Sequence, residues 1–380
     1  MQIASHLPLT SPGVYLQSMA PDPGLGLITG IPLFLGVAQM GHPYDRQQAL
    51  ELTLWTQFVD YFGDPLPHSH LGHAVRGFFE NGGDCCFVIP LGENTLAELQ
   101  RGLEVAETLS RVDLVCAPDL VRHPPDLAIA LQALVLEHCD RMGDRFAILD
   151  GLGGSDRQTL AYQKQRLVGD SGALYTPWLR VEGLLSDYVP PCGHVAGVYA
   201  RNDARVGPHH APANYQLEAV LDISAEFSDQ DWLALNPDRG AAVNFIRSFP
   251  SRGIRVWGAR TLSQNPDWRY VNIRRLTITM RRWIEGHLAG VVFEPNEPTL
   301  WDRLKRELTV YCEGLWERGA LQGNFPEEAF YIQCDEEINP PAVQDRGQVV
   351  VQIGLAVTSP SEFLVLSLIH GSNGVTLIQS

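Results

Sequence analysis

Short apolar runs alternate with helical patterns along residues 28–200. The apolar runs lie at residues 32–38, 85–90, 113–117 and 145–149. Helix-like segments such as residues 95–109 and 126–141 separate them. An alternation of strand and helix is typical of an α/β domain, in which largely parallel strands form one sheet covered by helices. We therefore predict an α/β domain over residues 28–240.

The pattern changes from Ala241 onward. A strand pair is expected around residues 243–246 and 254–257, and two long helices follow at residues 268–288 and 298–318. Three further strands are expected at residues 329–334, 348–357 and 362–369. Every odd position from Val349 to Val357 is apolar, which is the period-two pattern of a half-buried strand. These elements predict a second, α+β domain over residues 241–370.

The two ends of the chain differ from both domains. Residues 1–27 are rich in proline and turn residues around one strand-like run, residues 13–19, and residues 371–380 form a similar short extension. Such ends are either frayed tails or arms that add a strand to another sheet. Composition alone favours the tails.

Composition and charge narrow the class of protein. The chain has 380 residues, 45% of them hydrophobic, which indicates a globular protein with a real core. Its net charge of −16 disfavours binding to nucleic acid or to anionic lipids. Apolar stretches are too short for a membrane span, which needs about 20 residues. The first ten residues lack a signal-peptide pattern, and the seven cysteines suggest no disulfide framework. Synthesis is expected in the cytoplasm.

The charge is unevenly distributed. Residues 247–318 contain 13 basic and 8 acidic side chains, whereas the rest of the chain is strongly acidic. A basic block in an acidic protein indicates either a surface for an acidic partner or arginines paired inside the molecule. Both interpretations stay open at this point.

The helix expected at residues 268–288 has an apolar face and a basic face. Its apolar residues gather on one face: Leu276, Met280, Ile273, Trp283 and Ile284. Four arginines lie on the opposite face: Arg274, Arg275, Arg281 and Arg282. This face is either solvated, with local carboxylates such as Glu285, or opposed by the anions of a partner. In the next helix, Lys305 and Arg306 also point away from the apolar stripe.

Two side-chain clusters resemble metal sites only superficially. His68, His70 and His73 follow two prolines beside Asp64, which favours a solvated loop over zinc. Cys85 and Cys86 are adjacent on a strand, so their side chains point to opposite faces and buried thiols are expected. No metal is predicted.

A glycine-rich turn follows one of the predicted strands. Residues 150–156 occupy the place of a phosphate-binding loop but lack its full motif. No compact catalytic signature occurs. We predict no cofactor and no enzymatic activity from these residues.

Several longer motifs carry a resemblance to a known family. They lie at residues 11–15, 173–178, 189–201, 210–214, 235–237, 257–261, 270–276, 292–296, 319–323, 329–330, 334–335 and 361–363. Together they resemble the tail sheath proteins of contractile phage tails and related injection systems, and the similarity is strongest from about residue 170 onward.

The resemblance implies a structural protein that polymerises as six-fold rings around an inner tube. It is assembled in the cytoplasm in an extended, metastable state, as part of a phage tail-like particle, and contracts to drive the tube through a target envelope. Its expected partners are further copies of itself, the inner tube protein, and the baseplate and tail terminator or cap proteins. The alternatives are a non-contractile terminator or cap subunit, or a nucleotide-binding enzyme.

The resemblance also implies roles for parts of the chain. An outer α/β domain would be inserted in an inner α+β domain, with residues 1–27 and 371–380 as arms that exchange strands between neighbours. The candidates for strand exchange are Val14, Tyr15, Leu16, Phe363, Val365, Leu366, Leu368 and Ile369. The candidates for contact with the tube are Arg274, Arg275, Arg281, Arg282, Lys305 and Arg306.

Overall fold

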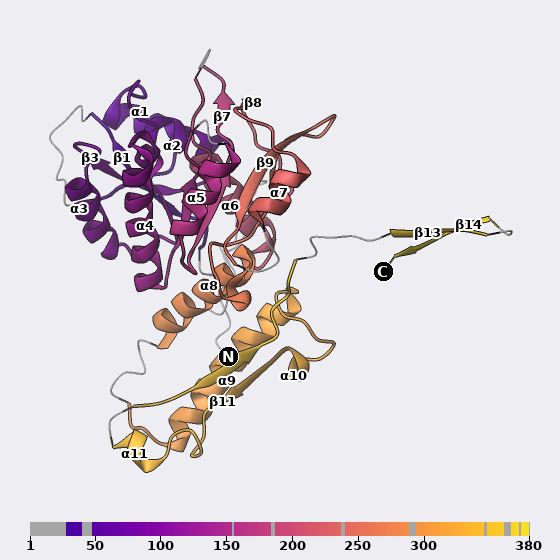
Figure 1. Cartoon of the computed structure of the whole chain (residues 1–380). Coiled ribbons are helices and arrows are strands. Elements are labelled where there is room, and N and C mark those ends of the chain that lie inside the picture. Colours follow the sequence, from indigo (N-terminus) through magenta and orange to yellow (C-terminus); the bar gives the residue numbers. More distant parts are fainter. Residues whose placement is uncertain are drawn as a thin grey trace, which may run out of the picture.

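The computed structural model shows an α/β body to which a smaller C-terminal part is joined (Figure 1). It describes residues 28–39, 48–153, 156–183, 187–236, 240–288, 294–345, 348–360, 366–371 and 374–379. The candidate strand-exchange residues Val14, Tyr15, Leu16, Phe363 and Val365 lie outside the described residues.

The body is built on a twisted mixed sheet. Its strands are β1 (Pro32–Val37), β2 (Leu50–Leu52), β3 (Cys86–Leu91), β4 (Leu114–Cys116), β5 (Phe146–Asp150), β6 (Gly172–Thr176), β9 (Val243–Phe249) and β10 (Gly253–Trp257). Among the described residues they form one eight-stranded sheet in the order β10-β9-β6-β5-β4-β1-β3-β2. The inner strands run parallel, and β2 and β10 are antiparallel at the two edges.

Helices cover both faces of this sheet. They are α1 (Trp55–Phe62), α2 (Leu71–Glu80), α3 (Leu96–Glu107), α4 (Pro125–Met142), α5 (Arg157–Arg166), α6 (Cys192–Val206) and α7 (Asp229–Leu235). Helices α1, α2 and α6 pack on one face, with Phe58, Val75 and Val195 in its core. Helices α3, α4 and α5 pack on the other face. Because both faces are buried, the central strands are continuous apolar runs, as the sequence predicts.

Shorter elements of the body lie outside the main sheet. Strands β7 (Leu179–Val181) and β8 (Val220–Ile223) pair antiparallel beside the main sheet. Single 3-10 turns occur at η1 (Pro118–Arg122) and η2 (Pro266–Trp268).

The sheet corrects the boundary predicted at residue 240. Strands β9 and β10 belong to the main sheet, because β9 pairs in parallel with β6 from Leu174–Val243 to Thr176–Phe245. The α/β body therefore continues through β10. The sequence predicts these two strands but does not tell which sheet they join.

The C-terminal part begins with two long helices. Its elements are α8 (Val271–Leu288), α9 (Pro298–Glu317), α10 (Pro326–Ala329), β11 (Phe330–Gln333), α11 (Pro341–Gln344) and β12 (Gln352–Leu355). We call the part from α9 to β12 the C-terminal module. In it, β11 and β12 pair antiparallel and pack on α9 through Ile332, Ile353 and Leu355. Figure 1 shows α8 between this module and the body.

The chain ends in a hairpin. Strands β13 (Leu366–Gly371) and β14 (Gly374–Gln379) pair antiparallel from Leu366–Gln379 to Gly371–Gly374. The boundary predicted at residue 370 thus falls inside a hairpin. Residues 374–379, part of the arm predicted from residue 371, form the second strand of this hairpin.

Candidate functional site

Helix α8 turns its arginine face toward the α/β body. Arg275 is 2% exposed. Its guanidinium group donates to Asp113 Oδ2 at 2.9 Å and to the two carboxylate oxygens of Asp203 at 2.8 and 2.6 Å. Burial alone would lower the pKa of Arg275, but the charges of Asp203 and Asp113 raise it. Arg275 is therefore a buried cation held by two carboxylates and packed over the Tyr199 ring.

The other three arginines of this face also have partners within the chain. Arg282 is 8% exposed and donates to the backbone carbonyls of Ser110 and Arg111. Arg274 is half-buried and donates to Ser171 Oγ. Arg281 is exposed, and its Nε lies 2.7 Å from Glu285 Oε1.

These contacts correct part of the predicted tube-facing set. Arg275 and Arg282 cannot present their charge at the molecular surface, because both guanidinium groups are buried against the α/β body. The basic block of residues 247–318 is thus partly explained by internal pairing with Asp113 and Asp203. Sequence reasoning missed these two aspartates, since neither lies near α8 in the chain.

The opposite face of α8 is apolar, as predicted. Leu276, Met280 and Trp283 pack in one cluster with Tyr311 and other residues of α9. The rings of Trp283 and Tyr311 stack with their centroids 4.0 Å apart. Helix α8 therefore contacts the body through its arginines and through Val271 and Ile278, which join the core of the body, and it contacts the C-terminal module through apolar groups.

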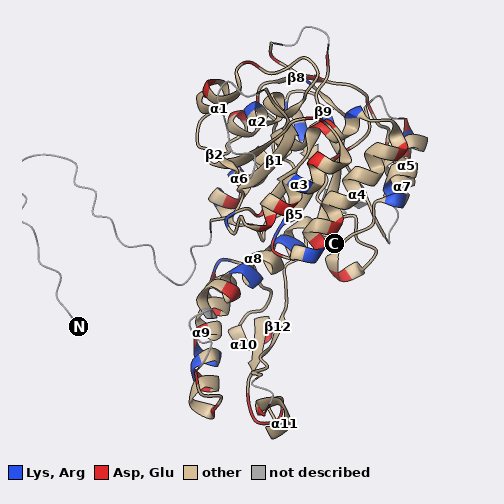
Figure 2. Ribbon diagram, turned by 90° about the vertical axis from the view of Figure 1, so that its left-hand side faces the viewer, with Lys and Arg blue, Asp and Glu red and all other residues tan. Residues whose placement is uncertain are grey.

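Helix α9 carries the remaining cations of the predicted set. Its apolar stripe is buried as predicted and includes Leu300, Leu304 and Leu308. Lys305 is half-buried and lies 3.5 Å from Asp302, whereas Arg306 is exposed. Figure 2 shows basic and acidic positions, coloured on the ribbon, along this helix.

The histidine and cysteine clusters are packed into the body. His68 is exposed, but His70 and His73 are half-buried, so the solvated-loop interpretation is wrong for these two. Burial, with Arg122 and His73 nearby, lowers the pKa of His70 to about 4. Burial also raises the pKa of Cys85 to about 11. Within the described ranges, no group of three or more His, Cys, Asp or Glu side chains could hold a metal ion.

The glycine-rich turn after β5 is filled by protein groups. Trp178 Nε1 donates to the Gly151 carbonyl, and a Cβ on Gly153 would meet the Trp178 ring at 2.8 Å. Burial raises the pKa of Asp150 to about 7, although the Cys192 N–H donates to its carboxylate. Gly151 and Gly153 of this turn are therefore packed against the Trp178 side chain.

Two parts of the C-terminal region could take part in strand addition. The described residues supply no third strand to the β11–β12 pair. Leu366, Leu368 and Ile369 lie in β13, which already pairs with β14 along one edge. If β13 joins a neighbour's sheet, it must do so through its other edge.

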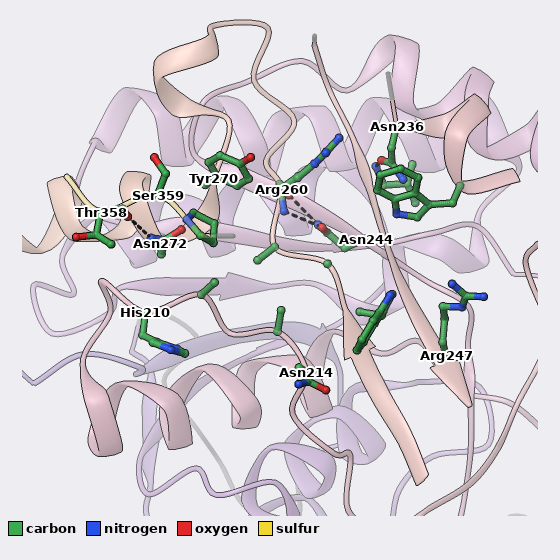
Figure 3. Close-up of a pocket in the computed structure, with 18 of the residues that line it drawn as sticks. His210, Asn214, Asn236, Asn244, Arg247, Arg260, Tyr270, Asn272, Thr358 and Ser359 are labelled. Carbon is green, nitrogen blue, oxygen red and sulfur yellow. Dashed lines mark hydrogen bonds between the residues drawn. The ribbon is translucent and has the colours of Figure 1, made fainter. Parts of the chain in front are cut away.

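A cavity of about 800 Å³ opens between the α6–β8 connection, the β9–β10 hairpin and the start of α8 (Figure 3). Residues 358–360 form part of its wall. Figure 3 shows Asn236 and Asn272 on different sides of it. None of the residues around it was expected to form a site from the sequence, because they come from six separate segments.

No helix among the described residues combines the length and apolar character that crossing a membrane requires.

Comparison with known proteins gives matches along most of the chain. Residues 92–262 match the phage tail sheath protein central domain, and residues 263–368 match the phage tail sheath C-terminal domain. The change from one to the other comes shortly after β10, where the main sheet also ends.

Solved structures agree in fold over nearly the whole length. A PVC sheath complex, from an extracellular contractile injection system in the contracted state, has a TM-score of 0.79 and 27% identity, covering 97% of this chain and 99% of that one. The helical sheath of the anti-feeding prophage in its contracted state has a TM-score of 0.78 and 28% identity, covering 95% of this chain and 99% of that one.

A curated relative is the tail sheath protein of Vibrio phage KVP40. It is 24% identical over 189 residues, which are 49% of this chain but only 27% of the phage protein. The two matched domains are the central and C-terminal domains of phage tail sheath proteins, and together they extend over residues 92–368. This chain therefore belongs to the phage tail sheath family.

Proposed function

We propose that this chain is the subunit of a contractile sheath. It polymerises as six-fold rings around an inner tube in an extended, metastable state, and it contracts to drive the tube through a target envelope. The observation that carries the proposal is the match to two contracted sheaths at 27 and 28% identity over 99% of their length. The family is structural and not enzymatic, so the function resides in interfaces.

The proposed partners follow from this role. Similar chains occur in a contracted helical sheath and in baseplate structures of the anti-feeding prophage, which supports association with further copies and with baseplate proteins. The inner tube protein and a terminator or cap protein complete the proposed set. The chain would act as a component of a phage tail or tail-like particle, assembled in the cytoplasm.

The two structured parts would have different places in the particle. We assign the α/β body to the outer layer and the C-terminal module, with both terminal segments, to the inner layer around the tube. The β11–β12 pair supports this assignment, because a two-stranded sheet gains backbone hydrogen bonds when strands from neighbours join it. Residues 14–16 and 363–369 are the proposed donors.

Electron microscopy tests the proposed function. The full chain, expressed together with the inner tube protein of the same gene cluster, is expected to form long striated cylinders around a tube. Isolated single rings would favour a terminator or cap subunit instead. A folded protein that forms neither, with the tube protein present, would contradict the proposal.

We further propose that Arg306, with Lys305 and Arg281, contacts acidic groups of the tube. Arg306 is exposed on α9, and Arg281 is exposed on α8. Exposed ion pairs contribute only about 0.2–1 kcal/mol each, and salt weakens them, so many copies together form a grip that can be released.

Charge reversal of Lys305 and Arg306 to Glu is expected to lower the fraction of extended sheath–tube particles, most strongly at low salt, because salt screens both the lost attraction and the new repulsion. Micrographs counted at two ionic strengths measure this fraction. The matched control reverses Arg157 and Arg166, two exposed arginines of α5 on the body. Equal behaviour of the two reversed variants would exclude these cations from the tube contact.

A further inference from the structure

Four arginines form a basic surface at the β10 edge of the main sheet. They are Arg201, Arg205, Arg252 and Arg255. Residues 214–217 run along the outer edge of β10, where the Leu217 N–H donates to the Ile254 carbonyl. The ring of Tyr215, in this segment, lies 5.7 Å from the guanidinium carbons of both Arg201 and Arg205. The end of α6 and the β9–β10 hairpin therefore present one continuous basic surface.

Neutral groups hold the cations of the hairpin in place. Arg252 donates to Asn214 Oδ1 at 2.8 Å and lies over the Phe249 ring. Arg255 donates to the backbone carbonyls of Asn214 and Arg252. These acceptors order the guanidinium groups but do not neutralise their charge.

Carboxylates compensate only a minor part of the charge of the basic surface. Glu218 lies 3.6 Å from Arg201. Within the described ranges, Arg205, Arg252 and Arg255 form no ion pair. Arginines that are already ordered lose little side-chain freedom when they meet the carboxylates of a partner. The basic surface is therefore prepared to bind an acidic one.

The opposite edge of the same sheet carries the complementary charge. Asp60 is exposed on α1, and Asp64 is exposed just after it. The register that pairs Leu52 with Cys86 brings the exposed Asp84 close to the start of α1. None of these three aspartates forms an ion pair with another described residue. We call Asp60, Asp64 and Asp84 the acidic surface.

Both surfaces combine their charge with exposed apolar groups. Leu54 is 60% exposed and Tyr61 is 45% exposed. Seven residues separate them, which is two helical turns, so they lie on the same side of α1. On the basic surface, Pro250 is exposed and Phe249 is half-buried. Tyrosine and arginine are enriched among the side chains that contribute most to protein interfaces.

We propose that the basic surface of one subunit binds the acidic surface of the next copy, an inference that rests on the proposed sheath function. The two surfaces lie at the β10 and β2 edges of one sheet, and Figure 1 shows α1 on the left of the body and β9 on its right. Such a contact is head-to-tail and repeats from copy to copy, so it builds a ring or a helix instead of a closed dimer. The net charge of −16 favours a second copy over nucleic acid as the partner.

Charge exchange between two chains tests this contact. One variant reverses the basic surface, Arg205→Glu with Arg252→Glu, and the other reverses the acidic surface, Asp60→Lys with Asp64→Lys. Each variant alone, expressed with the tube protein, is expected to give at least about tenfold fewer striated cylinders, because like charges then face each other. Expression of both variants together restores opposite charges at every contact and is expected to recover the cylinders.

The matched control is Arg157→Glu with Arg166→Glu, which changes the net charge equally on exposed positions of α5. This control is expected to assemble like the wild type. Normal assembly of either single-surface variant, or a mixture that assembles no better than its components, would overturn the proposal. Recovery in the mixture also shows that both variants fold.

Disulfide trapping measures the same contact without a sheath. All chains carry Cys85→Ser, so that the remaining native thiols are buried. Concentrated chains with Arg252→Cys are mixed with chains that carry Asp60→Cys and are oxidised with copper phenanthroline. The disulfide between the two chains is expected in at least about tenfold higher yield than with Leu127→Cys, an exposed position on α4, because only the first pair is held together.

The two readouts separate this proposal from the proposed function. If the wild type forms no cylinders but the first pair is trapped preferentially, the sheath function is wrong and the contact stands. If cylinders form and both cysteine pairs give equal yields, the sheath function stands and the contact is wrong. If cylinders are absent and the yields are equal, both are wrong.

Discussion

Replacement of Arg275 by Met is expected to destabilise the protein by about 3–5 kcal/mol. The side chains have similar length, but the variant leaves Asp113 and Asp203 buried beside each other without their common cation. These carboxylates are only 2–3% exposed, so water cannot replace the guanidinium group. Calorimetry should show a fall in Tm of roughly 5 °C.

Two further variants make this result specific. Arg281→Met removes an exposed arginine of the same helix, and its expected cost is at most about 1 kcal/mol. The triple variant Arg275→Met, Asp113→Asn, Asp203→Asn should recover part of the loss, because no unpaired charge remains. If the Arg275→Met and Arg281→Met variants have the same Tm, the buried ion pair does not hold α8 on the body.

Deletion of residues 1–19 is expected to abolish the assembly of long sheaths while the subunit still folds. The deletion leaves the described core, which begins at Ile28, and removes the proposed strand donor at residues 14–16. Negative-stain micrographs measure assembly, and circular dichroism with thermal melting measures folding.

The informative comparison is with Val14→Pro in the full-length chain. A proline removes one backbone N–H from the donated strand, so it should reduce assembly without shortening the chain. Normal sheaths from the deletion variant would show that residues 14–16 are not the exchanged strand. A deletion variant that melts well below the full chain would instead mean that these residues stabilise the subunit itself.

The sequence predicts most single elements of this fold. Strand β1 is expected at residues 32–38 and observed at Pro32–Val37, and helix α4 is expected at residues 126–141 and observed at Pro125–Met142. These elements have strong local signals, because a buried parallel strand is apolar throughout and a helix repeats with period 3.6. The prediction of the apolar face of α8 is correct for the same reason.

Long-range partners are what the sequence does not predict. The helical period places four arginines on one face of α8, but it does not distinguish a solvated face from one that meets carboxylates. The partners of Arg275 are separated from it by 162 residues for Asp113 and 72 for Asp203.

Asp113 joins two parts of the molecule that the sequence keeps far apart. Its Oδ1 accepts from the Ile31 N–H at 2.7 Å, and its Oδ2 accepts from the Gly30 N–H at 3.0 Å as well as from Arg275. Strand β1, which follows directly, is hydrogen-bonded on both sides, to β3 and to β4. Tension applied to the N-terminal segment by a neighbour would therefore load many backbone hydrogen bonds in shear at once. Through its ion pair with Arg275, the Asp113 carboxylate would transmit this force to α8. The N-terminal segment and α8 would therefore move under traction as one mechanical unit.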